Sequence, residues 1–343
     1  MGGNEPTGDG LTVRRGWDSF AAKMKARLLV FNCHEAWVHQ LAGMDYELDV
    51  IVGLPGRYTT GWDERMRPAP GNARLVRLEE ALESREAYHC IVAHNMTDLL
   101  DVKARRDPKL LILHCTLDGL IHEENSPLPP DEIRRTYGKY LELTRTHVVA
   151  VSELKGKTWG FAKDVILLSA NPQEYLPYSG ELARGLRISN QISRKRGVLR
   201  WDFHEAAFAG VPVQLVGHNP DLPGVEAAQD WNHLRQMLSA HRFYIHTADA
   251  RYEDGYNMST LEAMAAGLPV LGNRHPSSPI EHGVSGFLSD DAAELRDFSR
   301  RLLADRELAA RMGAAARKTV EERFSPRGFR EAMENAVEKA RRR

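Results

Sequence analysis

The sequence predicts an α/β protein built from two Rossmann-like domains, each a doubly wound parallel sheet, that face one another across a cleft. Short apolar runs rich in Leu, Val and Ile alternate with amphipathic stretches. Continuous apolar strands separated by helices are typical of parallel sheets that are covered on both faces. The pattern restarts midway along the 343 residues, and a chain of this length usually forms about two domains.

The composition excludes several classes of protein. Acidic and basic side chains nearly cancel, 47 against 46, whereas nucleic-acid binding relies on a surplus of Lys and Arg. No apolar run approaches the ~18 residues of a membrane span, and the N-terminus lacks the apolar core of a signal peptide. Cys33, Cys90 and Cys115 share no metal-binding spacing and are expected to be free thiols. We therefore expect a cytoplasmic protein with no nucleic-acid partner and no integral membrane segment.

The first domain is expected over residues 25–168, after a flexible tail, 1–24, that shows no hydrophobic periodicity. Its strands should be the runs that are Leu-rich or β-branched and do not alternate with polar residues. These are Arg27–Asn32, Leu48–Val52, Cys90–His94, Leu110–Cys115 and His147–Val151.

The pattern is interrupted at Ser169–Pro172 and at Pro177, which places a domain boundary near 165–180. A second domain is expected over 169–325, followed by a C-terminal helix, 326–343, that can pack back on the first domain. As the pattern restarts, further strands are expected at Val165–Ser169, Leu186–Ser189, Val211–Gly217, Phe243–Thr247, Leu268–Gly272 and Gly286–Ser289. Helices are expected at Gly197–Ala209, Val225–Ala240 and Ser259–Ala266, and in three runs between Asp291 and Lys339.

The segment Glu253–Gly272 contains the most informative pattern, a loop with two acids and a glycine that leads into a helix. Asn257 is a good N-cap, because its side-chain oxygen can accept a hydrogen bond from the amide of Ser259 or Thr260. The free amides of Met258 and the two residues after it, together with the helix dipole, would form an anion site at the carboxyl edge of the sheet.

Two acids flank this predicted anion site. Glu262 lies about one turn into the helix, where a carboxylate can accept hydrogen bonds from a vicinal diol such as a ribose. Asp254 precedes the helix and would project into the cleft, and Gly255 lets the backbone approach the anion closely. The alternative is that Glu262 only favours the helix dipole and that Ala263–Ala266 is simply core.

The segment opens a series of motifs, all of which lie in the stretch of about 210–340. The first reads Asp254-Gly-Tyr-Asn-Met-Ser-Thr-Leu-Glu262-Ala-Met-Ala-Ala-Gly267-Leu-Pro269-Val270. It continues with Ser278-Pro-Ile-Glu-His-Gly283-Val-Ser-Gly286-Phe-Leu and ends with Arg311-Met-Gly-Ala-Ala-Ala-Arg317 and Phe324-Ser-Pro. This series resembles the signature of the retaining glycosyltransferases of family 4 (glycosyl transferases group 1), which have the GT-B fold.

The resemblance implies transfer of a sugar from a nucleoside diphosphate sugar, a UDP- or GDP-sugar, to an acceptor hydroxyl, with no metal or other cofactor. The C-terminal domain would bind the donor and the N-terminal domain would face the acceptor. Glu262 inherits contact with the ribose and Asp254 contact with the sugar hydroxyls, as a catalytic residue. The family usually has Glu at the first position, so Glu253 is the alternative there. The donor-binding backbone falls on Gly255, Tyr256, Asn257, Met258 and Ser259.

The phosphate clamp departs from the family pattern, which places an Arg and a Lys about five residues apart. Arg196 is placed like the Lys, but Gln191 stands where the Arg would be. Either Arg194, Lys195 and Arg196 share the donor-binding task, or the clamp is weaker. The alternative to a binding role is that this basic triplet forms a solvated turn.

Three histidines lie at or just beyond the carboxyl ends of expected strands. His114 best matches the family's catalytic histidine near the reacting carbon, and His94 is the second choice. His34 is also a candidate cleft residue, in Asn32-Cys-His-Glu-Ala36, where the family has a Gly-rich loop. Open α/β sheets bind ligands at the carboxyl ends of strands, although such histidines are often ordinary hydrogen-bonded residues. His39 lies five residues after His34, which is the wrong helical face for a zinc-protease motif, so no metal site is expected.

Two alternatives to transfer remain: a non-catalytic sugar-nucleotide-binding subunit and a GT-B sugar-nucleotide epimerase. The acceptor is left open among a saccharide, a lipid-linked molecule and a small molecule. A lipid acceptor would bring the cytoplasmic protein peripherally to the inner membrane surface. A homodimer is a further arrangement to test.

Overall fold

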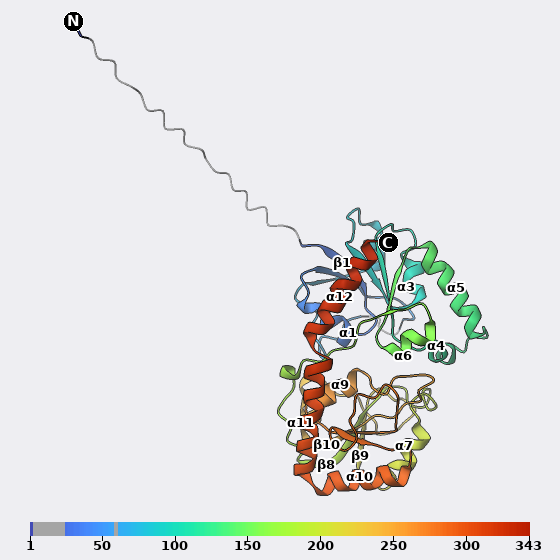
Figure 1. Cartoon of the computed structure of the whole chain (residues 1–343), viewed down its shortest axis with the longest axis vertical. Helices are drawn as coiled ribbons and strands as arrows, with labels where there is room; N and C mark the ends of the chain where they lie inside the picture. The colour runs from blue at the N-terminus through green and yellow to red at the C-terminus, as the bar shows by residue number, and fades with distance from the viewer. Residues whose placement is uncertain (3–24, 58–60) are drawn as a thin grey trace.

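The computed structural model describes residues 1–2, 25–57 and 61–343. Apart from Met1 and Gly2, the expected tail over 1–24 lies outside the described residues. The rest of the chain forms two α/β lobes, each built on a parallel sheet (Figure 1). The predicted fold class, two Rossmann-like domains, is confirmed. None of the helices in the described ranges combines the length and the apolar composition that a membrane span requires.

The N-terminal sheet has seven parallel strands in the order β3-β2-β1-β4-β5-β6-β7. The first six strands have the order of the dinucleotide-binding fold, which reverses direction between β1 and β4. The strands are β1 (Arg27–Phe31), β2 (Glu47–Ile51), β3 (Ala73–Val76), β4 (Cys90–Ala93), β5 (Lys109–Leu113), β6 (His147–Ala150) and β7 (Asp164–Val165). Around them lie α1 (Glu35–His39), η1 (Gln40–Gly43), α2 (Leu78–Glu83), α3 (Met96–Asp101), α4 (Leu117–Glu123), α5 (Pro130–Leu143) and α6 (Glu153–Trp159).

The C-terminal sheet has five parallel strands in the order β12-β11-β10-β8-β9, which is the other common doubly wound order and reverses between β8 and β10. The strands are β8 (Leu182–Ile188), β9 (Val213–Val216), β10 (His241–Ile245), β11 (Val270–Gly272) and β12 (Gly286–Leu288). The helices and turns of this half are η2 (Pro172–Glu174), α7 (Trp201–Ala207), α8 (Trp231–Ala240), α9 (Met258–Ala265), α10 (Ala292–Ala304), α11 (Arg306–Arg323) and α12 (Pro326–Arg341).

Three strands differ from the sequence prediction. The expected strand Val165–Ser169 is reduced to β7, and it pairs with β6 in the first sheet instead of opening the second. The sequence pattern does not predict β3, because this strand lies at the sheet edge and is short and partly exposed, so it lacks a continuous apolar run. The strand β8 begins at Leu182, four residues before the expected run, because its first three residues are exposed and carry no apolar pattern. Central strands such as β4 and β5 form where the apolar runs are, since every residue in them is buried.

The last helix, α12, crosses from the lower lobe to the upper one (Figure 1) and packs against β5. Phe329 and Met333 are buried on its inner face. The ring centroids of Phe329 and Trp37 lie 5.8 Å apart in an edge-on contact. Lys339 pairs with Asp164 at 2.8 Å at the far end of the helix. The helix therefore ties the C-terminal segment of the chain to the N-terminal sheet.

The two domains also meet directly at the N-terminus of α4. Thr116, the N-cap of this helix, donates through Oγ1 to the backbone carbonyls of Arg251, at 3.1 Å, and Tyr252, at 2.9 Å. Gly119 makes this close approach possible, because a Cβ there would lie 2.5 Å from the Tyr252 oxygen. The contact fixes the loop after β10 against the first domain.

Candidate functional site

A cavity of about 320 Å³ lies between the two domains, at the lower end of the size range of small-molecule sites. It opens at the carboxyl ends of strands on both sides of the cleft, beside the points where the strand order of each sheet reverses, which is where open α/β sheets bind ligands. Its lining residues are His34, Trp37, His114, Glu123, Val151, Lys155 and Leu168 from the first domain, and Ile188, Ser189, Asn190, Lys195, Val198, Leu199, Glu253, Asn257, Met258 and Ser259 from the second.

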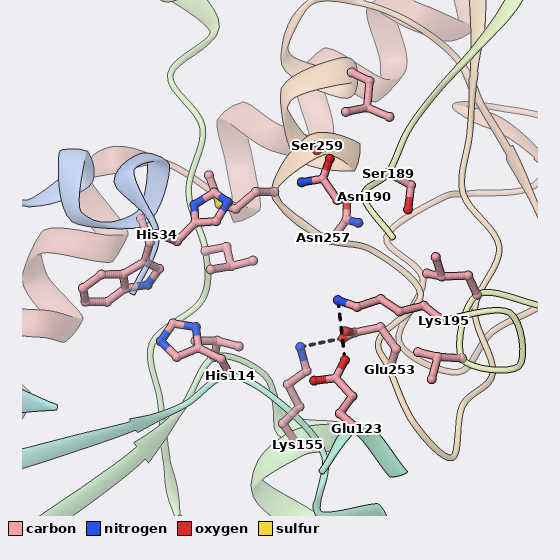
Figure 2. A pocket seen from close by; sticks show the side chains of 17 residues that line it. His34, His114, Glu123, Lys155, Ser189, Asn190, Lys195, Glu253, Asn257 and Ser259 are labelled. Atoms are coloured by element: carbon pink, nitrogen blue, oxygen red, sulfur yellow. Dashed lines mark ion pairs between the residues drawn. The ribbon is translucent and has the colours of Figure 1, made fainter. Parts of the chain in front are cut away.

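The N-terminus of α9 forms one wall of the cavity. Asn257 caps this helix as predicted, because its Oδ1 accepts from the amide of Thr260 at 2.9 Å. Met258 and Ser259, the first two helical residues, line the cavity. The first amides of a helix have no intrahelical acceptor and carry the positive end of the dipole. This wall is therefore suited to an anion, and Figure 2 shows it across the cavity from His34 and His114.

The two acids before α9 occupy different places. Glu253 lines the cavity, whereas Asp254 is 2% exposed and accepts from Ser277 Oγ at 2.9 Å. Lys155 of α6 joins them, with its Nζ 2.6 Å from Glu253 and 3.3 Å from Asp254. Burial alone would lower the pKa of Lys155, but the two carboxylates outweigh it and raise that pKa. Of the two acids proposed for the sugar hydroxyls, Glu253 is the one that faces the cavity (Figure 2).

Two residues of the predicted donor loop do not line the cavity. Gly255 packs beneath His275, where a Cβ would lie 2.7 Å from the ring Nδ1. Tyr256 is buried and its ring lies 5.3 Å from that of Phe324. The missing Cβ of Gly255 thus accommodates a neighbouring side chain, and Tyr256 belongs to the core.

Glu262 lies in α9 but outside the cavity lining. Its Oε1 is 2.7 Å from Nη2 of Arg67, which comes from the N-terminal domain, and both side chains are 8% exposed. Burial raises the pKa of Glu262, and the guanidinium of Arg67 opposes that rise. The Arg67 guanidinium also lies over the ring of Trp231, 3.2 Å from its centroid.

The three residues of the basic triplet, 194–196, lie in three different environments. Lys195 lines the cavity and lies 3.5 Å from Glu123 of the first domain. Arg196 is exposed and pairs with Asp202 and Glu205, both at 2.5 Å. Arg194 lines a separate hollow beside Asn190. The structure thus brings Lys195, but not the other two, to the cavity beside the anion-binding wall.

Two of the three predicted histidines meet directly. Nδ1 of His94 and Nε2 of His114 are 2.8 Å apart, so one of the two nitrogens donates to the other. Burial lowers the pKa of His94 to about 3. Burial also lowers the pKa of His114 well below its usual value, and His94 and Lys155 lower it further. The pair is therefore neutral at pH 7, and it is His114 that reaches the cavity together with His34.

One cluster within the described ranges has the composition of a metal site. Ligand atoms of Cys33, His94 and His114 lie within 4.8 Å of one another. They follow β1, β4 and β5, so no spacing along the chain could reveal them. A metal ion would need a lone pair from each imidazole, and the hydrogen bond between the histidines uses one of these. The arrangement is better suited to orienting His114 than to holding a cation.

Sequence reasoning missed several residues of the site. Lys155 lies in the first turn of α6, just after β6 and the N-cap residue Ser152. This position at the carboxyl edge of the sheet is a signal in the sequence that indicates a site residue. Asn190 and Ser189 follow β8 at the same kind of edge. Arg67 had no such signal, because it lies in an irregular segment between two strands.

Buried neutral histidines make stability depend on pH. Burial lowers the pKa of His94 and His246 to about 3 and that of His204 to about 2, whereas the unfolded chain titrates near 6.5. Below pH 6.5 the unfolded state binds more protons than the folded state. The free energy of unfolding therefore falls as the pH is lowered from 6.5 to the pKa values of the folded state. We expect each of these histidines to lower the free energy of unfolding by about 2 kcal/mol when the pH falls from about 7.5 to about 5.

Urea unfolding at the two pH values measures this loss. The variant His246→Gln should show a pH difference that is smaller by about 2 kcal/mol than that of the wild type, since one titrating group is gone. Equal stability of the wild-type protein at both pH values would show that these histidines are not buried and neutral.

Comparison with known proteins gives one family match. Residues 194–334 match the family model described as "Glycosyl transferase-like". Among curated proteins, N-acetyl-alpha-D-glucosaminyl L-malate synthase of Bacillus anthracis is 38% identical over 76 residues, which cover 21% of this chain and 20% of that protein. The matched region spans about a fifth of the length of this curated relative.

Solved structures match over nearly the whole chain. HepE of Anabaena, in complex with UDP and glucose, aligns with a TM-score of 0.68 at 15% identity, covering 92% of this chain and 99% of that one. Sucrose-phosphate synthase of Thermosynechococcus elongatus aligns with a TM-score of 0.66 at 15% identity, covering 92% of this chain and 99% of that one. A glycosyltransferase of Rickettsia africae aligns with a TM-score of 0.63 at 14% identity, covering 92% of this chain and 98% of that one. These likenesses show the two-domain GT-B fold.

Proposed function

We propose that this chain is a retaining glycosyltransferase, which moves a sugar from a nucleoside diphosphate sugar to an acceptor hydroxyl. The observation that carries the proposal is the cavity between the domains, where the N-terminus of α9 and the side chain of Lys195 converge. The match of residues 194–334 to a glycosyl transferase-like family supports it. The structural neighbour crystallised with UDP and glucose favours a UDP-sugar as donor.

The chemical difficulty of such a transfer is the departure of a diphosphate from a carbon that becomes oxocarbenium-like. In our proposal the amides of Met258 and Ser259 and the ammonium of Lys195 stabilise the leaving oxygens. Such groups act most strongly when they are fixed in place in a cavity that excludes water. These protein charges offset the phosphate charge without requiring a metal ion.

Glu253, Lys155 and His114 of the cavity lining would hold the sugar. Glu253 can accept hydrogen bonds from sugar hydroxyls, and Lys155 fixes its carboxylate at 2.6 Å. His114 lies across the cavity as a neutral imidazole, so it can donate or accept a hydrogen bond at the reacting sugar but is not a charged acid at pH 7. His94 would fix which nitrogen of His114 carries the proton.

An assay of nucleotide release tests this proposal. The full chain is incubated with UDP-, GDP- and ADP-sugars, with and without a panel of saccharide, lipid-linked and small-molecule acceptors. Release that requires an acceptor, with the anomeric configuration retained in the product, is the expected result. A changed sugar without release would indicate an epimerase, and tight binding without turnover would indicate a non-catalytic subunit.

The phosphate clamp gives a specific prediction. Lys195→Met should weaken nucleoside diphosphate binding about tenfold, because a hydrogen bond to a charged group is lost. Arg196→Met is the matched control and should leave the dissociation constant unchanged within about twofold, since exposed ion pairs contribute little. Isothermal titration calorimetry measures both. The reverse order of effects would assign the clamp to Arg196.

A further inference from the structure

The segment that links β2 to β3 contacts the second domain through residues of its described part, 61–67. Its described part is held on its own domain by Asn32, whose Nδ2 donates to the carbonyl of Gly61 at 2.8 Å. On the other side, the amide of Trp231 donates to the carbonyl of Arg65 at 2.9 Å. This places the neighbouring Arg67 against two helices of the C-terminal domain.

Arg67 makes two contacts there with its guanidinium. Nη2 donates to Oε1 of Glu262 at 2.7 Å, and Cζ of the guanidinium lies 3.2 Å from the centroid of the Trp231 ring. The position is fixed by Trp62, whose Nε1 donates to the Arg67 carbonyl at 2.7 Å. A planar cation thus lies on an aromatic face while it donates to a buried carboxylate.

A nucleoside could make the same two contacts. Its ribose presents hydroxyl donors that suit a carboxylate, and its planar base can stack on an indole ring. Both partners of Arg67, Glu262 and Trp231, are thereby covered by a side chain of the opposite domain. Since the Glu262 side chain is only 8% exposed, a ribose can reach the carboxylate only where Arg67 leaves it.

We propose that Arg67 sets the affinity for the donor by competing with its nucleoside for Glu262 and Trp231. This inference rests on the proposed function. Donor binding would be coupled to the release of the Gly61–Arg67 segment from the C-terminal domain. The fraction of molecules with Glu262 released would then limit the apparent affinity for the nucleotide.

Calorimetric titration with UDP and GDP tests the competition on the full chain. Arg67→Met, which keeps an unbranched apolar stem and removes the guanidinium with its donors, should bind nucleotide about tenfold more tightly than the wild type. Arg65→Met is the matched control, because Arg65 is exposed and pairs only with Asp63 of its own segment among the ion pairs described; it should bind like the wild type. Thermal melts show whether each variant is folded. If Arg67→Met does not fold, Arg67→Lys replaces it in the titration, because lysine keeps the charge and loses the planar group that stacks on Trp231.

Hydrogen exchange supplies an independent readout. UDP or GDP should increase exchange of the amides in Gly61–Arg67 in the wild-type protein. If the wild type binds nucleotide and Arg67→Met binds it equally or more weakly, Arg67 is not a competitor and the inference is overturned. If neither the wild type nor any variant binds, the proposed function fails and the inference fails with it.

Discussion

Replacing Lys155 by methionine is expected to lower the free energy of unfolding by about 3–5 kcal/mol. The ammonium of Lys155 lies between Glu253 and Asp254, at 2.6 and 3.3 Å. Asp254 is 2% exposed, so the variant leaves a buried carboxylate without the cation that pairs with it in the described part of the chain. Such an uncompensated charge is far more costly than the loss of a surface pair. Urea unfolding at neutral pH measures the change.

Two further variants make this result specific. Lys157→Met removes an exposed lysine from the same helix, one whose ammonium lies 3.9 Å from Glu153, and should change stability by less than about 1 kcal/mol. Combining Lys155→Met with Asp254→Asn should restore part of the loss, since the buried charge is removed. A Lys155→Met protein as stable as the wild type would show that these charges are not buried together.

Replacing His114 by alanine is expected to lower kcat about a hundredfold, the usual cost of removing one hydrogen-bonding group that acts on the transition state. His114 lines the cavity opposite the N-terminus of α9. The dissociation constant for UDP or GDP should change little, because the proposed nucleotide contacts lie on the other domain. Steady-state kinetics with the donor and acceptor found by the release assay measures kcat.

The matched control is His122→Ala. His122 is an exposed histidine at the end of α4 and does not line the cavity, so its variant should keep the wild-type rate. An unchanged transfer rate in His114→Ala would remove His114 from the mechanism. A fall in nucleotide affinity with kcat preserved would make it a binding residue.

Much of the fold follows from local patterns. Runs such as Leu110–Cys115 predict β5 closely because both faces of a central strand are buried, which leaves a continuous apolar run. The edge strand β3 escapes this rule because Arg74 and Leu75, which point to opposite faces of the sheet, are both exposed. The cap at Asn257 is also predictable, since a capping side chain and the amide that it accepts from are three residues apart.

The details of the site depend on partners that are distant in the sequence. Glu253 and Asp254 look equivalent as neighbours, and only the positions of Lys155 and Ser277 turn one into the cavity and the other into the core. Arg196 matches the family position, but the acids of α7 bind it outside the cavity. Such choices are made by tertiary contacts, which spacing along the chain does not record.

Crystals of the full chain grown with UDP or GDP test most directly whether the cleft binds an activated sugar. We expect the diphosphate about 3 Å from the amides of Met258 and Ser259 and from Nζ of Lys195. Nucleotide bound elsewhere on the molecule, with the N-terminus of α9 free of it, would contradict this assignment.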